Sequence, residues 1–182
     1  MSTHTDPVTS SLEQYRSDFP ALHQTHPNGS PVVYLDTGAS AQKPQCVIDA
    51  VSRCYSEYYA NAYRGVYYFG ARIDEELENA REQVRNLLNA KSAHEIVFTA
   101  GTTMSINMVA QGWGRKALSA GDEIILNLLE HHANLVPWQM IAQETGAILK
   151  YLPLTADGQL DLDQLPNLLT NKTKLLAVNA AI

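Results

Sequence analysis

Residues 122–154, DEIILNLLEHHANLVPWQMIAQETGAILKYLPL, decide the fold of this chain. The segments 122–129 and 147–154 are mostly hydrophobic, short and uninterrupted, which is typical of buried strands. The residues between them, 134–145, predict a helix, and Gly146 suits its C-terminal cap because glycine readily adopts a positive φ. A strand, a helix and a second strand joined by short connections indicate parallel pairing in an α/β sheet.

The same alternation extends to both sides of this segment. Further strands are predicted at 31–38, 95–101 and 173–182. Further helices are predicted at 43–59, 73–90, 102–113 and 161–169, and a short one within 12–22 that ends before Pro20. Strands that alternate with helices in this way favour a sheet with helices packed on both faces. We therefore predict an α/β fold with a mostly parallel sheet and an N-terminal helical segment.

Composition and charge narrow the class of protein. The 182 residues are 45% hydrophobic and 18% charged, which is typical of a globular chain. A net charge of −6 gives no electrostatic reason to expect nucleic acid or an anionic membrane as a partner. No apolar run reaches the roughly 20 residues of a spanning helix, and the N-terminus does not resemble a signal peptide. Cys46 and Cys54 are too far apart on one predicted helix to bridge, so two free thiols favour a cytoplasmic location.

A strand-to-helix junction at 98–107, FTAGTTMSIN, carries the first candidate site. Gly101 supplies the sharp turn, and Thr102 and Thr103 open the following helix. The start of a helix offers unpaired N–H groups and the positive end of the dipole, so it can bind a phosphate with help from the hydroxyls. The structural alternative is that Thr102 or Thr103 only caps the helix. The junction does not have the spacing of a Walker loop.

The second candidate site is Glu130-His131-His132, at the next strand-to-helix junction. Three roles compete for the paired histidines: a metal site, a purely structural pair, or an imidazole that lies against an aromatic cofactor and moves protons near neutral pH. No further ligand stands at a spacing typical of a metal site, so we predict no bound metal.

Four motifs in this order carry a resemblance to a known family: YLDTGASAQKP (34–44), YRG (63–65), VFTAGTTMSIN (97–107) and EHHANLVPWQ (130–139). Together they resemble the first half of the pyridoxal-phosphate enzymes of aminotransferase class V. Within that class they are similar to the cysteine desulfurases of the SufS type. The resemblance implies the fold-type-I transferase architecture, with an N-terminal segment at 1–34 and a partial cofactor-binding large domain at 35–182.

The resemblance also implies roles for individual residues. Thr102 and Thr103 would contact the phosphate of pyridoxal 5'-phosphate, and His131 would stack on its ring and take part in proton transfer. Gly38, Ala39 and Arg64 would lie on the substrate side or at a dimer interface. The family reaction converts L-cysteine into alanine and an enzyme persulfide, whose sulfur an acceptor protein receives for iron–sulfur cluster assembly, and its members are homodimers.

The sequence departs from the family pattern in two respects. The family's Schiff-base lysine, nucleophilic cysteine and substrate-binding arginine all lie beyond residue 182, so we expect activity only together with that part. Tyr63 also stands where SufS-type relatives have histidine, and tyrosine titrates near 10 rather than about 6.5. Selenocysteine lyase or kynureninase-like chemistry and an inactive, ligand-binding remnant remain alternatives. An incomplete large domain should also expose apolar surface.

Overall fold

The computed structural model describes residues 13–179 of the chain. The chain divides into two compact units, Met1–Ile96 and Val97–Ile182. The predicted N-terminal segment, 1–34, includes residues 1–12, which lie outside the described part, and its boundary stays a prediction.

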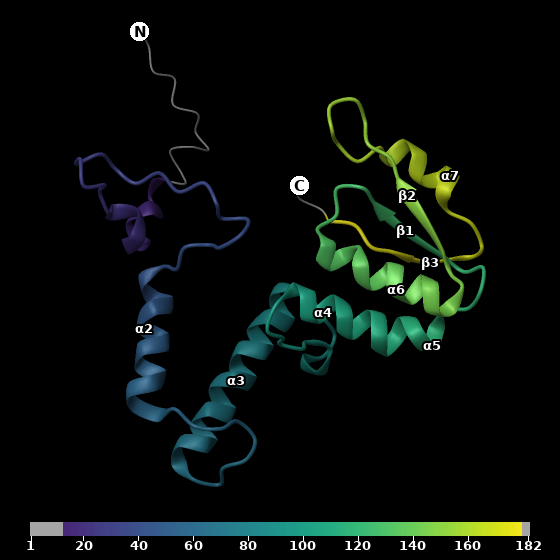
Figure 1. Ribbon diagram of the computed structural model, residues 1–182. Helices are drawn as coiled ribbons and strands as arrows, with labels where there is room; N and C mark the ends of the chain where they lie inside the picture. Colours follow the sequence, from purple (N-terminus) through teal and green to yellow (C-terminus); the bar gives the residue numbers. More distant parts are fainter. Residues whose placement is uncertain (1–12, 180–182) are drawn as a thin grey trace. The chain divides into compact units, whose positions relative to one another are not determined.

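The second unit is built on a parallel sheet of three strands, β1 (Glu123–Asn127), β2 (Ile148–Leu152) and β3 (Thr173–Leu176). The strand order is β2-β1-β3, so β1 lies in the centre, and both of its neighbours run parallel to it (Figure 1). The parallel α/β sheet predicted from the sequence is therefore confirmed. The predicted last strand ends earlier than expected, and residues 180–182 lie outside the described part.

Helices cover both faces of this sheet. All five residues of β1 are buried, as expected for a strand that is covered on each side. Ile124 and Leu126 point to one face, where they pack against Trp138 and Ile141 of helix α6 (Val136–Thr145). On the other face, Lys150 is the register partner of Ile125, and its Nζ donates a hydrogen bond of 3.0 Å to the backbone oxygen of Leu168 in α7 (Leu165–Leu168).

The helix predicted at 102–113 forms, but not as one uniform element. It begins as α4 (Thr102–Val109), continues through a π-helical turn, η5 (Ala110–Gly114), and ends with α5 (Arg115–Ala117). Ala110 is fully buried in the core with Trp138 and Ile141, which fixes this helix against α6. Two 3₁₀ turns, η6 (His132–Asn134) and η7 (Leu162–Gln164), lead into α6 and α7.

The first unit is mainly helical. It contains α2 (Gln45–Arg53), which continues as a π-helical turn, η3 (Cys54–Tyr58), the long helix α3 (Tyr68–Leu87) and a 3₁₀ turn, η4 (Ala93–Glu95). The helix predicted to end before Pro20 is present only as a 3₁₀ turn, η1 (Arg16–Asp18), and a second 3₁₀ turn, η2 (Pro20–His23), begins at the proline. Pro20 ends the first turn as predicted, because proline has no N–H with which to continue a helix that precedes it.

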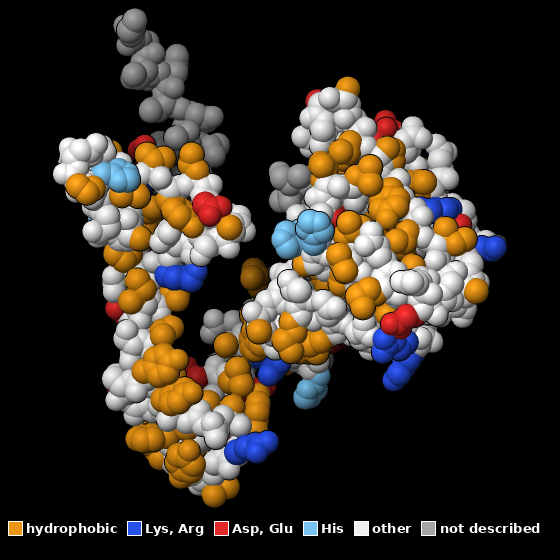
Figure 2. All heavy atoms as spheres, viewed as in Figure 1, with side chains coloured by type: hydrophobic (Ala, Val, Ile, Leu, Met, Phe, Trp, Pro, Cys, Tyr) orange, Lys and Arg blue, Asp and Glu red, His pale blue; other side chains and the backbone are white. Residues whose placement is uncertain are grey.

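Two predicted strands, at 31–38 and 95–101, do not form. An extended segment becomes a strand only where a neighbouring segment supplies hydrogen-bond partners. For residues 31–38, the pairing in the described structure is an isolated β-bridge between Thr25 and Pro31. Their hydrophobic side chains are largely exposed, with Leu35 at 91% and Val97 at 64%. Figure 2 shows many such apolar side chains on the visible surface. The exposed apolar surface expected from the sequence is therefore present.

Helix α3 forms as predicted, but its apolar stripe is only partly covered. Ile73, Leu77 and Val84 are half-buried, whereas Leu87 and Leu88 at its end are exposed. Both cysteines are free thiols, Cys46 exposed and Cys54 half-buried. Within residues 13–179, no helix combines the length and the apolar character needed to cross a membrane.

Candidate functional site

The start of α4 has an open first turn. Gly101 is its N-cap residue, with a φ of 154° and a ψ of 172°, a backbone conformation that only glycine adopts without strain. The Thr99 hydroxyl donates to the Gly101 carbonyl at 3.1 Å and lies 2.7 Å from the Ser105 hydroxyl. Hydrogen bonds between residues of the turn itself therefore stabilise it. This geometry explains why the FTAGTT sequence changes direction sharply here.

Neither Thr102 nor Thr103 caps the helix. The N-cap residue is Gly101, whose own N–H donates to the Thr99 hydroxyl at 3.4 Å, and both threonines are exposed within the first turn of α4. Thr102 and Thr103 therefore present their hydroxyls beside free backbone donors at the positive end of the helix dipole. The capping alternative does not hold, and the turn keeps the chemical character of an anion-binding site.

The turn that carries His131 is fixed by local hydrogen bonds. His131 is the N-cap residue of η6, and its Nδ1 accepts a hydrogen bond of 3.1 Å from the backbone N–H of Ala133. An Nδ1 that accepts carries no proton, so the neutral ring has its proton on Nε2. The imidazole is exposed and meets the His132 ring edge-on, at 6.3 Å between centroids and 72° between planes. His131 is thus presented outward with one nitrogen occupied and the other available.

The two candidate segments belong to the same unit and are in contact. Helix α4 packs against the η6 turn, and Ile106 of α4 and Leu135 after η6 both pack against the core cluster of this unit. Among residues 13–179, no group of three histidine, cysteine or acidic side chains could hold a metal ion. The unit therefore places helix α4, which begins with Thr102 and Thr103, against the turn that begins after the exposed His131.

The other predicted site residues lie in the first unit. Gly38 and Ala39 are exposed in a turn in which the Ala39 N–H donates to the Asp36 carbonyl at 3.2 Å. Arg64 is exposed and, among the described residues, makes no ion pair.

Tyr63, the neighbour of Arg64, is firmly anchored to α3. Its backbone N–H donates to Asp74 Oδ1 at 2.6 Å, and its hydroxyl donates to Glu78 Oε1. The Tyr63 hydroxyl lowers the pKa of the Glu78 carboxyl below its ordinary value, and the nearby Arg81 guanidinium lowers it further. Arg64 therefore directly follows a residue that two hydrogen bonds fix to α3.

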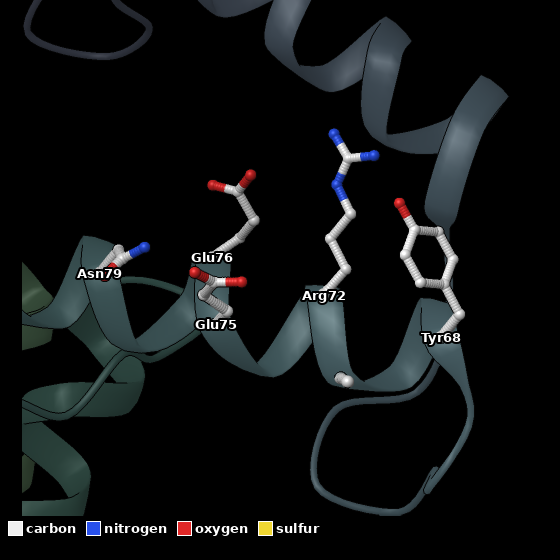
Figure 3. Close-up of a pocket in the computed structure, with 6 residues that line it drawn as sticks. Tyr68, Arg72, Glu75, Glu76 and Asn79 are labelled. Atoms are coloured by element: carbon white, nitrogen blue, oxygen red, sulfur yellow. The ribbon is translucent and has the colours of Figure 1, made fainter.

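The hollow shown in Figure 3 is not part of these candidate sites. It has a volume of about 370 Å³ along α3 and is lined by Tyr68, Ala71, Arg72, Glu75, Glu76 and Asn79. The Arg72 guanidinium also lies 3.8 Å from the centre of the Tyr58 ring and forms an ion pair with Glu57 at 3.7 Å. This charge is engaged in holding the helices of the first unit together.

Comparison with known proteins gives the family. The family described as aminotransferase class V matches residues 33–181, which is most of the chain. The chain belongs to the aminotransferase class V family. Curated relatives in this family include cysteine desulfurases from Escherichia coli O8 and Escherichia coli O9:H4, which are 47% and 48% identical over 171 residues. The match covers 94% of this chain but only 42% of each relative.

Solved structures show a similar relation. The cysteine desulfurase CsdA from Escherichia coli is 46% identical with a TM-score of 0.73, and the match covers 90% of this chain and 40% of that one. A cysteine desulfurase from Thermococcus onnurineus NA1 is 32% identical with a TM-score of 0.78, over 98% of this chain and 41% of that one. C-DES, whose structure holds glycine linked to its PLP cofactor, is 23% identical with a TM-score of 0.71, which shows a common fold alone.

The class V motif EHHAN contains functional detail that sequence reasoning missed. Glu130 and Asn134 flank His131 in a polar network with Asn127 and Trp138. The available signal was the spacing: an asparagine at the end of a strand, and an asparagine four residues before a tryptophan on a helix. The network therefore fixes residues on both sides of His131.

Proposed function

We propose that this chain forms the cofactor-binding part of a cysteine desulfurase, with Thr102 and Thr103 at the phosphate of pyridoxal 5'-phosphate and His131 against its ring. The observation that carries this proposal is that helix α4, whose open first turn exposes two threonines, packs against the η6 turn, whose N-cap residue is the exposed His131. Backbone N–H groups, hydroxyls and helix dipole together suit a phosphate dianion. A flat imidazole suits a flat pyridine ring.

Residues of this chain would bind the cofactor and hold it in position. When bound, pyridoxal phosphate supplies an electron sink that withdraws charge from the substrate's α-carbon. Thr102 and Thr103 bind its phosphate and so fix its position. His131 covers one face of the ring and, through Nε2, can hold or move a proton there, while the Ala133 N–H keeps Nδ1 occupied.

The identity of the relatives supports L-cysteine as the substrate of the assembled enzyme. Cysteine desulfurases at 47% identity cover 94% of this chain. On this proposal the products are alanine and an enzyme persulfide, the sulfur passes to an acceptor protein for iron–sulfur cluster assembly, and the enzyme is a cytoplasmic homodimer. Gly38, Ala39 and Arg64 would serve on the substrate side or at the subunit interface. The thiol and the Schiff-base lysine would come from sequence that corresponds to the unmatched part of the relatives.

Binding of pyridoxamine phosphate tests the cofactor site directly. This form has an amine in place of the aldehyde, so it cannot react with surface lysines. We expect Thr102→Val with Thr103→Val to raise its dissociation constant, measured by calorimetry, at least about tenfold, because hydrogen bonds to a charged group are lost. His131→Ala should weaken binding of both pyridoxamine phosphate and phosphate-free pyridoxamine, whereas the threonine pair should affect only the former.

The control is Thr25→Val, an exposed threonine of the other unit whose side chain makes no described hydrogen bond. It should leave both affinities unchanged. Equal affinity of the wild-type chain and the threonine variant for pyridoxamine phosphate would falsify the assignment of the phosphate site.

A further inference from the structure

Glu130 joins three segments of the second unit through its carboxylate. Oε1 accepts hydrogen bonds from Asn127 Nδ2, at 2.5 Å, and from the backbone N–H of Asn179. Oε2 accepts from Asn134 Nδ2 at 2.9 Å. The donors come from the end of β1, from the η6 turn and from the segment after β3. Both carboxylate oxygens therefore face donors only.

The orientation of both asparagine amides is dictated by a second partner. Asn134 Oδ1 accepts the indole N–H of Trp138 at 3.0 Å, and Asn127 Oδ1 accepts the backbone N–H of Leu129 at 2.8 Å. An indole and a backbone N–H can only donate, so neither amide can exchange its oxygen and nitrogen without placing two donors together. Each NH₂ group must then point at Glu130. Among the described residues, no buried side-chain polar atom lacks a partner.

This network holds the residues on either side of His131. Glu130 precedes it, and Asn134 closes the turn by donating its backbone N–H to the His131 carbonyl at 2.8 Å. The Glu130–Asn134 hydrogen bond therefore spans the residue that carries the imidazole, and the core residue Trp138 anchors it to α6. The His131 ring makes its own bond to the Ala133 N–H inside the same turn.

We propose that Glu130 is the positioning residue of His131. Its two carboxylate oxygens accept hydrogen bonds from the side-chain amides of Asn127 and Asn134, whose orientations are fixed by their other partners. These hydrogen bonds set the direction in which the exposed His131 imidazole points. The claim that the imidazole faces a pyridine ring rests on the function proposed above. The claim that Glu130 positions the imidazole rests only on the hydrogen bonds, so the two claims can be tested separately.

An exchange of hydrogen-bond polarity between positions 130 and 134 tests this inference. In Glu130→Gln, one oxygen becomes an NH₂ group that opposes the Asn134 donor or the donors at Oε1. In Asn134→Asp alone, two carboxylates face each other. The double variant E130Q/N134D restores every match. Its new carboxylate at position 134 offers oxygens both to the Trp138 indole and to the new amide at position 130, and that amide keeps an oxygen for Asn127. The total charge of the double variant equals that of the wild type.

The readout is the ¹⁵N and ¹H resonances of the His131 ring and the Trp138 indole in the full chain. We expect each single variant to displace these signals and to lower the thermal midpoint by about 5 °C, as loss of one buried hydrogen bond does in a small domain. The double variant should return both toward wild-type values. Glu144→Gln, which removes a carboxylate from the exposed Arg115–Glu144 ion pair of the same unit, is the matched control and should leave the His131 signals in place.

Three results would overturn the inference. They are a Glu130→Gln variant with unmoved His131 signals, a folded double variant whose His131 signals stay displaced, and a double variant that folds no better than Glu130→Gln. Pyridoxamine phosphate affinity in the same variants separates this inference from the proposed function. It should fall about fivefold in Glu130→Gln, the equivalent of one hydrogen bond, and recover in the double variant. His131 ring signals that shift in the single variants and return in the double variant, while the affinity for pyridoxamine phosphate stays constant, would support the positioning role and contradict the cofactor assignment.

Discussion

Tyr63 is held in an uncommon backbone conformation by its contacts with helix α3. Its φ of 59° is in the left-handed region, which a bulky side chain adopts only where other contacts hold it. Here the backbone N–H bonds to Asp74, the hydroxyl bonds to Glu78, and Arg81 Nη2 donates to the hydroxyl at 3.3 Å. A histidine at this position could exchange protons near neutral pH, whereas this tyrosine is committed to a structural network. We infer that it orders the turn that bears Arg64.

Removal of the Tyr63 hydroxyl should be visible at Glu78. The hydroxyl is the largest cause of the lowered Glu78 pKa, so Tyr63→Phe should raise that pKa toward its ordinary value. Because the folded pKa is lowered, Glu78 contributes stability above its unfolded pKa, and this contribution is lost as pH falls through the folded value. The variant should lose less stability on acidification than the wild type does.

Carboxyl ¹³C titration by NMR measures this pKa. Glu82 is the internal control, because its pKa is lowered by Arg85 on the same helix and involves no tyrosine. An unchanged Glu78 titration in Tyr63→Phe would contradict the role given to the hydroxyl.

At the level of elements, the end of α6 depends on one glycine. Gly146 has a φ of 77°, and a Cβ there would lie 3.0 Å from the Ala120 Cβ. Gly146→Ala should therefore destabilise the chain by roughly 1–2 kcal/mol, measured by urea unfolding. Gly112→Ala is the matched control, because Gly112 lies in the helical η5 turn and its Cβ would meet nothing within 4 Å. It should be neutral or stabilising by up to about 1 kcal/mol.

A buried glutamate at the start of β1 forms an ion pair and hydrogen bonds within the sheet. Glu123 is buried, and its Oε2 pairs with Lys150 Nζ of β2 at 2.8 Å and accepts from the hydroxyls of Thr170, at 2.7 Å, and Thr173, at 3.1 Å. Hydrogen bonds from Lys150 and then Thr170 are the largest causes of its lowered pKa. Glu123 therefore links all three strands on the face that α7 covers.

Replacement of Glu123 by glutamine should change the pH dependence of stability. A lowered folded pKa means that stability is present above the unfolded pKa and is lost as pH falls through the folded value. Glu123→Gln should thus be less stable at neutral pH and show a flatter acid limb in urea unfolding. Glu144→Gln, which breaks an exposed pair, should have a smaller effect that disappears in 0.5 M salt, at about a 4 Å screening length. If the free energy of unfolding of Glu123→Gln ran parallel to that of the wild type at every pH, the stabilising role of the Glu123–Lys150 ion pair would be excluded.

For the whole molecule, many large apolar side chains are exposed to solvent. Leu35 is 91% exposed, Val66 is fully exposed and Leu128 is 68% exposed. Side chains of this kind promote association when they are not covered. We expect sedimentation velocity of the isolated chain to show concentration-dependent species larger than its 20.1 kDa.

A triple variant, Leu35→Ser, Val66→Ser and Leu128→Ser, should shift the distribution toward the monomer. A control with the exposed polar residues Gln83 and Gln143 changed to alanine should behave as the wild type. A monomeric wild type over the whole concentration range would contradict the expectation.

The sequence by itself determined the local structure and the family. The alternation within 122–154, the C-terminal cap at Gly146 and the motifs around Thr102 and His131 depend on neighbours along the chain, so they could be recognised without coordinates. Helix α3 was predictable for the same reason. The roles of Thr102, Thr103 and His131 stay predictions that the open helix start supports.

Only the tertiary structure decided what pairs with what. Residues 31–38 and 95–101 have the hydrophobicity of strands, but strand formation requires a partner from elsewhere in the chain, and composition does not reveal one. The hydrogen bonds of Glu130 likewise depend on the segment after β3, whose Asn179 N–H donates to the carboxylate, and on which end of each asparagine amide faces it. Local pattern specifies elements because backbone hydrogen bonds in helices and turns are local, whereas sheet pairing and buried polar matching are not.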